Sequence, residues 1–481
     1  MYREIENEGQ NVLSKRFRCR RRWFGVLTFG LMLLLFAACE EDYKPGEIPT
    51  VPYNPDKSVT VSSFSPEKGR YGTRLMIEGD NFGTDTSKII VSVGGVKAKV
   101  ISSTGSLIYC IVQARSYEGT IEVSILGANE EPVATAVAGQ KFLYETQLLV
   151  STIIGEKVTD INNFDSSDGL FDEVGGVWRA SWLSYDPKNR NHLYLADDGG
   201  PIRRLDFSDN TITTMFRNGY NGGNRFRTIE WTLGGDTMII ATDMGGDHET
   251  SAMLATRNEG FMDLRAFLPS GTRQCNGASI HPVNGELYYN SYQNGQVYRY
   301  DWQTKEREHL FNILDQSWEF NIQIHPTGNY AYILVINRHY IMRTDYDWSN
   351  KTFGTPYLIC GEVSRAGYAD GVGASVRLDQ PYQGAFVKNP DYAGRADEYD
   401  FFFCDKMNHC VRKLTPEGVV STYAGRGSAA LNSNPWGAID GDLRLEARFD
   451  RPDGLIYDAE NDCFYIGDQQ NRRIRKIAWT E

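Results

Sequence analysis

Aromatic, arginine, amide and acidic side chains recur at one point in a series of similar segments. Four of these segments align on Asp186, His281, His325 and Asp458, and the recurring residues precede each alignment point by several positions. Aromatic rings stack on the faces of sugars, and arginine forks bind carboxylates, so the composition predicts recognition of a neutral or acidic sugar. The recurring residues are Trp178, Arg179, Arg225, Arg227, Arg273, Asn276, Trp318, Glu319, Tyr382, Gln383, Arg451 and Asp453.

Two alternatives stay open for these residues. Each one taken singly fits a structural role, in which it lines or plugs a channel. An error of one residue in the alignment would also place each side chain on the opposite face of its strand, because side chains alternate along a strand.

Catalysis would need a different arrangement of the same segments. A metal-dependent reaction requires Glu, Asp, Asn or His ligands that converge, and the nearest candidates are Glu230, Glu319, Asn276 and Asp453. The sequence contains no G-x-S-x-G, H-E-x-x-H or GxxxxGK[ST] motif. His281 and His325 occupy the repeat position that holds Asp186 and Asp458 elsewhere, so a role in a turn is expected for them. We therefore predict no cofactor, with a divalent metal in the channel as the open alternative.

Composition limits the class of protein. The chain has 481 residues, and 50 Lys and Arg against 62 Asp and Glu give a net charge of −12. This length predicts two or three domains. An acidic chain is a poor partner for nucleic acid, since phosphate binding requires a basic field. The many Gly, Tyr and Phe residues favour short strands and turns over helices.

The elements that position the candidate site are repeats. The runs FYIGDQQNRRIRKI at 464–477, FCDKMNHCVRKL at 403–414, and LYLAD at 193–197 followed by IRRL at 202–205 align with one another. Weaker copies fill the region between them. The segments resemble NHL repeats, the units of a β-propeller, and the spacing of their third strands gives six blades over residues 146–481. In such a propeller the candidate residues would surround the mouth of the central channel.

Closure of the propeller is also predicted from the sequence. The last repeat stops after its third strand, at Trp479, without an outer strand. Residues 148–155 resemble the outer strand of the fifth repeat, so we expect them to complete the last blade. This pairing would bury a strand edge that would otherwise be open.

A second unit precedes the propeller. Seven alternating runs separated by Gly, Pro and Asn turns predict an immunoglobulin-like sandwich over residues 58–145. The segments FSP at 64–66, IEGDNFG at 77–83 and VSVGG at 91–95 resemble the IPT/TIG domain family. The resemblance implies that Phe82 fills the core beside the Gly-Asp-Asn turn. We interpret this domain as a spacer.

The N-terminal residues predict an export signal. Six Lys and Arg between 15 and 22 precede an apolar run over 23–38, which is shorter than the roughly 20 residues of a membrane span. The sequence FAAC at 36–39 resembles a bacterial lipobox, which implies a signal peptide over 1–38 and lipidation of Cys39. The acidic residues at 40–42 resemble the export tag of Bacteroides-type surface lipoproteins. Residues 39–57 then form a proline-rich tether. An ordinary cleaved signal with an incidental cysteine is the alternative.

These observations predict a lipid-anchored protein of the outer membrane, facing the cell exterior, which binds a glycan at the propeller mouth. Other outer-membrane glycan-uptake proteins are expected as partners. Two alternatives are a metal-dependent propeller hydrolase, lactonase or lyase that acts on a carbohydrate-like substrate, and a protein-binding platform. Cys404 and Cys410 flank one hairpin turn and either form a disulfide or are small core residues.

Overall fold

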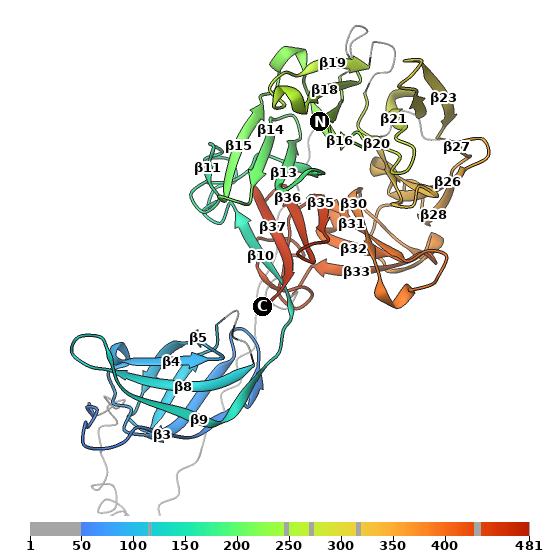
Figure 1. Ribbon diagram of the computed structural model, residues 1–481. Helices are drawn as coiled ribbons and strands as arrows, with labels where there is room; N and C mark the ends of the chain where they lie inside the picture. Colours follow the sequence, from blue (N-terminus) through green and yellow to red (C-terminus); the bar gives the residue numbers. More distant parts are fainter. Residues whose placement is uncertain are drawn as a thin grey trace, which may run out of the picture.

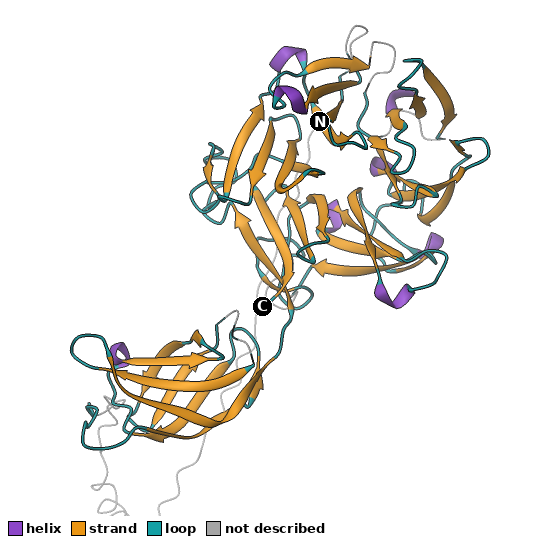
Figure 2. Ribbon diagram, in the orientation of Figure 1, coloured by secondary structure: helices purple, strands orange, loops and turns teal. Residues whose placement is uncertain are grey.

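A computed structural model describes residues 50–113, 116, 118–244, 250–268, 274–313, 319–427 and 434–480. Strands dominate, and they form a sandwich followed by a propeller (Figure 1). Short 3₁₀ turns are the helical elements of the described chain (Figure 2): η1 (Thr86–Lys88), η2 (Tyr220–Gly222), η3 (Arg257–Glu259), η4 (Tyr292–Asn294), η5 (Ile336–Arg338), η6 (Gly373–Ser375), η7 (Pro390–Tyr392) and η8 (Lys406–Asn408). No helix in these described ranges is long and apolar enough to cross a membrane.

The sandwich consists of two sheets with a shared apolar core. One sheet has the order β1-β3-β7-β6 and the other β2-β9-β8-β4-β5. The last strand, β9, is long because the run from Pro132 also pairs with β8. The strands are β1 (Thr60–Ser65), β2 (Lys68–Gly69), β3 (Arg74–Asp80), β4 (Ile89–Val93), β5 (Val96–Lys97), β6 (Lys99–Ser103), β7 (Leu107–Ile111), β8 (Gly119–Leu126) and β9 (Pro132–Tyr144).

The Gly-Asp-Asn turn anchors the sandwich as its sequence indicates. Phe82 is 1% exposed and lies in the core. A Cβ at Gly79 would lie 2.3 Å from the ring of Phe82 and 2.0 Å from the carbonyl oxygen of Thr60, so a larger residue would clash. Asn81 donates to the carbonyl oxygens of Asn54 and Lys57 at 2.8 and 2.6 Å. The end of the predicted tether is therefore fixed to the sandwich instead of extending freely.

Six sheets of the described chain surround a common axis as the blades of the propeller (Figure 1). Blade 1 contains β11 (Gly169–Leu170), β12 (Ala180–Asp186), β13 (Asn189–Asp197), β14 (Ile202–Asp206) and β15 (Thr211–Phe216); blade 2 contains β16 (Phe226–Trp231), β17 (Thr237–Thr242), β18 (Ala252–Thr256) and β19 (Arg265–Leu268); blade 3 contains β20 (Ala278–Ile280), β21 (Leu287–Ser291), β22 (Gln296–Tyr300) and β23 (Arg307–Asn312). Blade 4 contains β24 (Phe320–Ile324), β25 (Tyr330–Val335), β26 (Tyr340–Asp347), β27 (Thr352–Phe353) and β28 (Tyr357–Gly361); blade 5 contains β29 (Gly371–Val372), β30 (Pro381–Lys388), β31 (Tyr399–Asp405), β32 (Cys410–Leu414) and β33 (Val419–Gly425).

Blade 6 closes the ring with a strand from the start of the propeller. It contains β34 (Gly441–Asp442), β35 (Pro452–Asp458), β36 (Cys463–Asp468), β37 (Arg473–Trp479) and β10 (Leu148–Ile154). Val150 pairs with Ile477 across antiparallel β10 and β37. The predicted closure is confirmed, and the exposed edge of β37 is removed. The inner strands β12, β16, β20, β24, β30 and β35 contact one another in sequence around the channel.

Blades 1, 5 and 6 share a buried arginine on their third strand. Arg203, Arg412 and Arg475 are at most 1% exposed. In blade 6, Arg475 donates to Asp468 at 2.7 Å, to Asp440 at 2.5 Å and to two backbone carbonyl oxygens. Asp440 also accepts from Thr152 of β10. The Asp and Arg residues of this repeat therefore join the second, third and outer strands of blade 6.

The aligned Asp and His residues end the inner strands and cap the next turn. Asp186 accepts from the backbone N–H of Lys188, and Asp458 accepts from Glu460 and Asn461. His281 and His325 accept through Nδ1 from backbone N–H groups two or three residues ahead. The predicted role of the two histidines in turns is confirmed. Cys404 and Cys410 are buried free thiols in the core.

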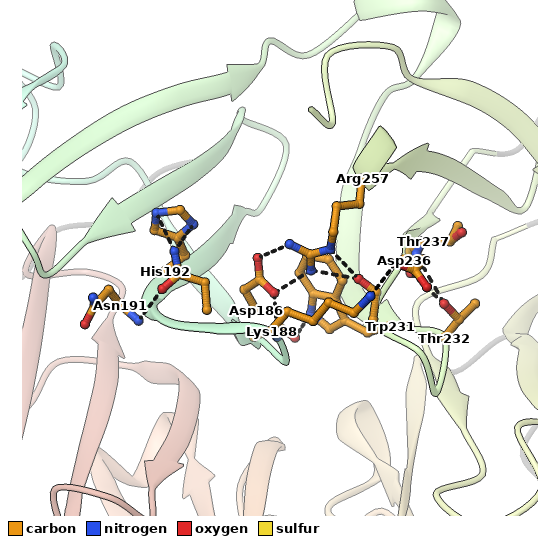
Figure 3. Close-up of polar contacts among 12 residues, drawn as sticks. Asp186, Lys188, Asn191, His192, Trp231, Thr232, Asp236, Thr237 and Arg257 are labelled. Atoms are coloured by element: carbon orange, nitrogen blue, oxygen red, sulfur yellow. Dashed lines mark hydrogen bonds and ion pairs between the residues drawn. The ribbon is translucent and has the colours of Figure 1, made fainter. Parts of the chain in front are cut away.

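Arg257 of η3 joins blade 2 to the inner-strand turn of blade 1 (Figure 3). Its guanidinium points at Asp186 and donates to both carboxylate oxygens, at 3.0 and 2.5 Å, and to the carbonyl oxygen of Gly235 at 2.7 Å. The side chain of Asp186 is 1% exposed. The neighbouring pair of Lys188 and Asp236 is far more exposed, at 46% and 66%.

Replacing Arg257 by alanine is expected to lower the free energy of unfolding by about 2 kcal/mol, because Asp186 would lose its charged donor in a buried position. Lys188→Ala is the matched control, with an expected loss below about 1 kcal/mol for an exposed pair. Urea denaturation of both variants measures the difference. Equal effects of the two substitutions would contradict a larger stabilising role for the buried Arg257–Asp186 contact between the blades.

Candidate functional site

The predicted mouth residues lie where the inner strands begin. Trp178 and Arg179 directly precede β12, and Asn276 precedes β20. Arg451 precedes β35 and is exposed. Arg227, Tyr382, Gln383 and Asp453 lie at or near the start of β16, β30 and β35. Arg273, Trp318 and Cys39 fall outside the described residues.

Arg227 is the centre of a charged network at this end of the channel. It is 6% exposed and donates to Asp243 at 2.6 Å and to Asp198. Arg225 donates to the same oxygen of Asp243 at 2.5 Å, and Arg179 lies 3.8 Å from Asp198. Two carboxylates thus fix the guanidinium between blades 1 and 2.

Asp198 and Asp243 are charged residues of the mouth that the sequence interpretation missed. They occupy equivalent repeat positions: the backbone N–H of each donates to the residue that precedes the inner strand of its blade, at 3.0 Å. Tyr292, Ile336 and Lys406 make the same bond in blades 3, 4 and 5, at 3.2, 2.9 and 3.2 Å. In the sequence, only the shared repeat position could have indicated these residues, and the chemically different residues that occupy it in the other blades obscured it. Tyr292 also donates to Asp243, at 2.8 Å.

Lys406 and Asp453 form a second charged pair near Tyr382. Lys406 Nζ donates to Asp453 Oδ2 at 3.0 Å and lies 5.4 Å from the centre of the Tyr382 ring. Burial raises the pKa of Asp453 to about 7, although Lys406 opposes the shift. Burial also raises the pKa of Glu319, with Arg227 opposing it. Both carboxyl groups therefore hold protons more tightly than exposed ones, and a protonated carboxyl can donate a hydrogen bond.

Several polar atoms of the mouth are buried without a partner among the described residues. They are Asn276 Nδ2, Asp453 Oδ1 and Arg227 Nε. A buried polar group without a hydrogen bond costs about 1–3 kcal/mol. Two of these atoms are donors and one is an acceptor, and all three are enclosed by the surrounding side chains.

Trp178 supplies an aromatic surface at the rim. It is 43% exposed, and Phe164 stacks against it at 6.2 Å with an interplanar angle of 20°. The guanidinium of Arg472 lies 4.9 Å from the centre of its ring, and Arg472 donates to its backbone carbonyl. The indole is held in place while much of it stays accessible.

Gln383 has a structural role in the channel wall. Its Oε1 accepts from the backbone N–H groups of Leu183 and Leu455 at 2.9 and 3.0 Å, and its Nε2 donates to the carbonyl of Leu183 at 2.7 Å. These bonds join the inner strands of blades 5, 6 and 1. The side-chain amide of Gln383 is bonded within the propeller wall, so it is not free to bind a ligand as the sequence predicted.

A cavity of about 230 Å³ lies deeper in the channel, and all six inner strands line it. Glu230 lies in it, near the end of β16, and therefore away from Glu319 and Asp453 at the strand starts. Burial raises the pKa of Glu230 to about 8, and the backbone N–H of Ile280 donates to its carboxylate. Among the described residues, no group of three or more His, Cys, Asp or Glu side chains is placed to hold a metal.

The raised pKa of Glu230 predicts a pH-dependent cost to stability. Below its ordinary pKa of 4.5 the carboxyl is protonated in both states and costs nothing. Between pH 4.5 and about 8 the unfolded state loses the proton and the folded state keeps it. Stability should therefore fall by about 1.4 kcal/mol per pH unit relative to Glu230→Gln. Urea denaturation of both proteins from pH 5 to 9 should show a gap that widens to about pH 8 and then stays constant. A stability difference between the two proteins that does not change with pH would contradict the raised pKa of Glu230.

Fold and site together define an IPT/TIG sandwich followed by a six-bladed propeller with a polar channel mouth. The IPT/TIG domain family matches residues 59–144. No curated protein matches the sequence.

Solved structures of Bacteroides proteins match most of the chain. An auxiliary nutrient binding protein of Bacteroides thetaiotaomicron is 48% identical, with a TM-score of 0.75, over 89% of this chain and 100% of the other. An auxiliary nutrient binding protein of Bacteroides ovatus is 38% identical, with a TM-score of 0.73, over 90% and 100%. A protein of Bacteroides thetaiotaomicron described as a putative phosphatase is 40% identical, with a TM-score of 0.69, over 89% and 99%. The chain belongs to the family of these Bacteroides proteins.

Proposed function

We propose that this protein is a surface lipoprotein that captures a nutrient glycan at the propeller mouth. Two relatives in the family are described as auxiliary nutrient binding proteins, which supports a binding role. In this proposal Cys39 carries the lipid, and the sandwich holds the propeller away from the outer membrane.

The observation that carries the proposal is the set of unpartnered buried atoms at the mouth. Asn276 Nδ2 and Arg227 Nε are donors, and Asp453 Oδ1 is an acceptor. Sugar hydroxyl groups both donate and accept, so they complement this set. Trp178 lies at the rim with an accessible indole, on which the apolar face of a sugar ring can stack.

Most charges of the mouth are paired within the protein, which favours a neutral sugar over a strongly acidic one. The described residues of the mouth include five basic and four acidic side chains: Arg179, Arg225, Arg227, Lys406 and Arg451 against Asp198, Asp243, Glu319 and Asp453. Arg227 already pairs with two carboxylates, which leaves little of its charge for an anionic ligand.

A glycan array probed with the mature chain, residues 39–481, tests this function. Binding of an intact glycan that is insensitive to EDTA is the expected result. A complete absence of glycan binding would overturn the proposal.

A hydrolytic function is the second candidate, favoured by the relative described as a putative phosphatase. Product analysis of every glycan hit, together with an assay on p-nitrophenyl phosphate, distinguishes the two. Turnover that EDTA abolishes would favour a metal-dependent enzyme over a capture protein.

A further inference from the structure

A second hollow lies between blades 3 and 4, at the end of the blades opposite the mouth. Its volume is about 610 Å³. The turns that follow β20, β22 and β26 line it. Inner strands begin at the mouth and β20 ends at the turn over residues 281–286, so this turn lies at the far end of the propeller. The hollow and the mouth are therefore separate.

Two tryptophans border this hollow with their rings fixed in place. Trp302 is 36% exposed and Trp348 is 45% exposed. Trp302 Nε1 donates to the carbonyl oxygen of Gly285 at 2.9 Å, and Trp348 Nε1 donates to Asn329 Oδ1 at 2.9 Å. Phe267 stacks on Trp302 at 5.2 Å with an interplanar angle of 12°. Ligand binding would not have to order these rings, which lowers its entropic cost.

The rest of the hollow is a polar network that is already ordered. Arg299 donates to Glu286 at 3.3 Å, to Glu308 and to the carbonyl oxygen of Lys351. Asn284 donates to the hydroxyl of Tyr346 at 2.6 Å and to Glu286 at 3.1 Å. The charged residues that line the hollow are Glu286, Asp301, Arg299 and Lys351, whose formal charges cancel.

We propose that this hollow is a second saccharide-binding site, for a neutral oligosaccharide whose rings lie against Trp302 and Trp348. Fixed indole surfaces beside ordered donors and acceptors match the apolar faces and hydroxyl edges of sugar rings. Because the two acidic and two basic residues that line the hollow balance one another, the hollow favours a neutral ligand over a charged one. The ligand class rests on the proposed function, but the site does not depend on the mouth. Two sites on one propeller would let the protein hold two parts of a long glycan, which raises its apparent affinity.

The test is ¹⁹F NMR of the mature chain labelled with 5-fluorotryptophan. Trp302→Phe, Trp348→Phe and Trp178→Phe assign the three resonances of interest, and Trp479→Phe assigns an exposed control. The probes are cellohexaose, xylohexaose, mannohexaose and maltohexaose. We expect one hexasaccharide to shift the Trp302 and Trp348 resonances together, with a single dissociation constant, and Trp302→Ala to weaken that binding by about tenfold or more.

The outcomes separate this site from the mouth. If the Trp302 and Trp348 resonances shift while the Trp178 resonance does not, the second site is supported and the mouth proposal is weakened. If only the Trp178 resonance shifts, the mouth is supported and the second site is overturned. A shift of neither Trp302 nor Trp348, or of one without the other, also overturns the second site.

Discussion

Replacing Arg475 by methionine is expected to lower the free energy of unfolding by about 3–5 kcal/mol. The side chain is fully buried and donates to Asp468, whose carboxylate is fully buried too. Methionine would fill much of the volume but leave that carboxylate without its cation. The same arginine holds Asp440, which binds the closing strand β10 through Thr152. Loss of Arg475 should therefore weaken the contact that closes the ring.

Guanidinium chloride denaturation measures this effect, and Lys476→Ala is the matched control. Lys476 is the next residue of β37 and is only partly buried, so we expect its loss to cost less than about 1 kcal/mol. A double substitution that also replaces Asp468 by asparagine should recover part of the stability, because no unpaired buried charge remains and the amide oxygen can still accept from the backbone N–H of Asp450. An Arg475→Met protein as stable as the Lys476→Ala protein would refute the role of the buried arginine.

Glycan affinity should fall by about 30-fold or more when Asp453 is replaced by asparagine or Trp178 by alanine. Asp453→Asn keeps the size of the side chain and an oxygen that can accept from Lys406, but it presents an N–H₂ group where Asp453 Oδ1 now has no partner. Trp178→Ala removes the accessible indole of the rim. The two changes affect different parts of the ligand. Because changes in contacts within one binding site act mostly on the dissociation rate, we expect the glycan to leave both variants faster.

Isothermal titration with the glycan identified on the array measures these affinities. Trp479→Ala is the matched control: that indole is 48% exposed, but it lies at the end of β37, while the start of β37 is the end that pairs beside the mouth. Thermal unfolding of each variant shows whether the fold is retained. Wild-type affinity in both folded mouth variants would rule out the mouth as the binding site.

The propeller could be predicted from the sequence because its repeats carry local signals. The buried Arg of blades 1, 5 and 6, and the Asp or His at the end of the inner strand in blades 1, 3, 4 and 6, form bonds that recur with the repeat. The closing strand resembles an outer strand of another blade, so its pairing with β37 could also be inferred.

The details of the mouth could be predicted only in part, because they depend on contacts between blades. Gln383 bonds to Leu183, 200 residues away, and no local pattern indicates that bond. Asp198 and Asp243 share a repeat position, but Tyr292 and Ile336 occupy it in the next blades, so no common chemistry marks it. The bonds of Asn81 to the tether were missed for the same reason: they join residues that no repeat relates.

A crystal structure of the mature protein with its highest-affinity glycan would test the central claim most directly. Our account predicts a sugar ring against Trp178, with hydroxyl groups bonded to Asn276 Nδ2 and Asp453 Oδ1. A glycan bound elsewhere, with no sugar at the mouth, would contradict it.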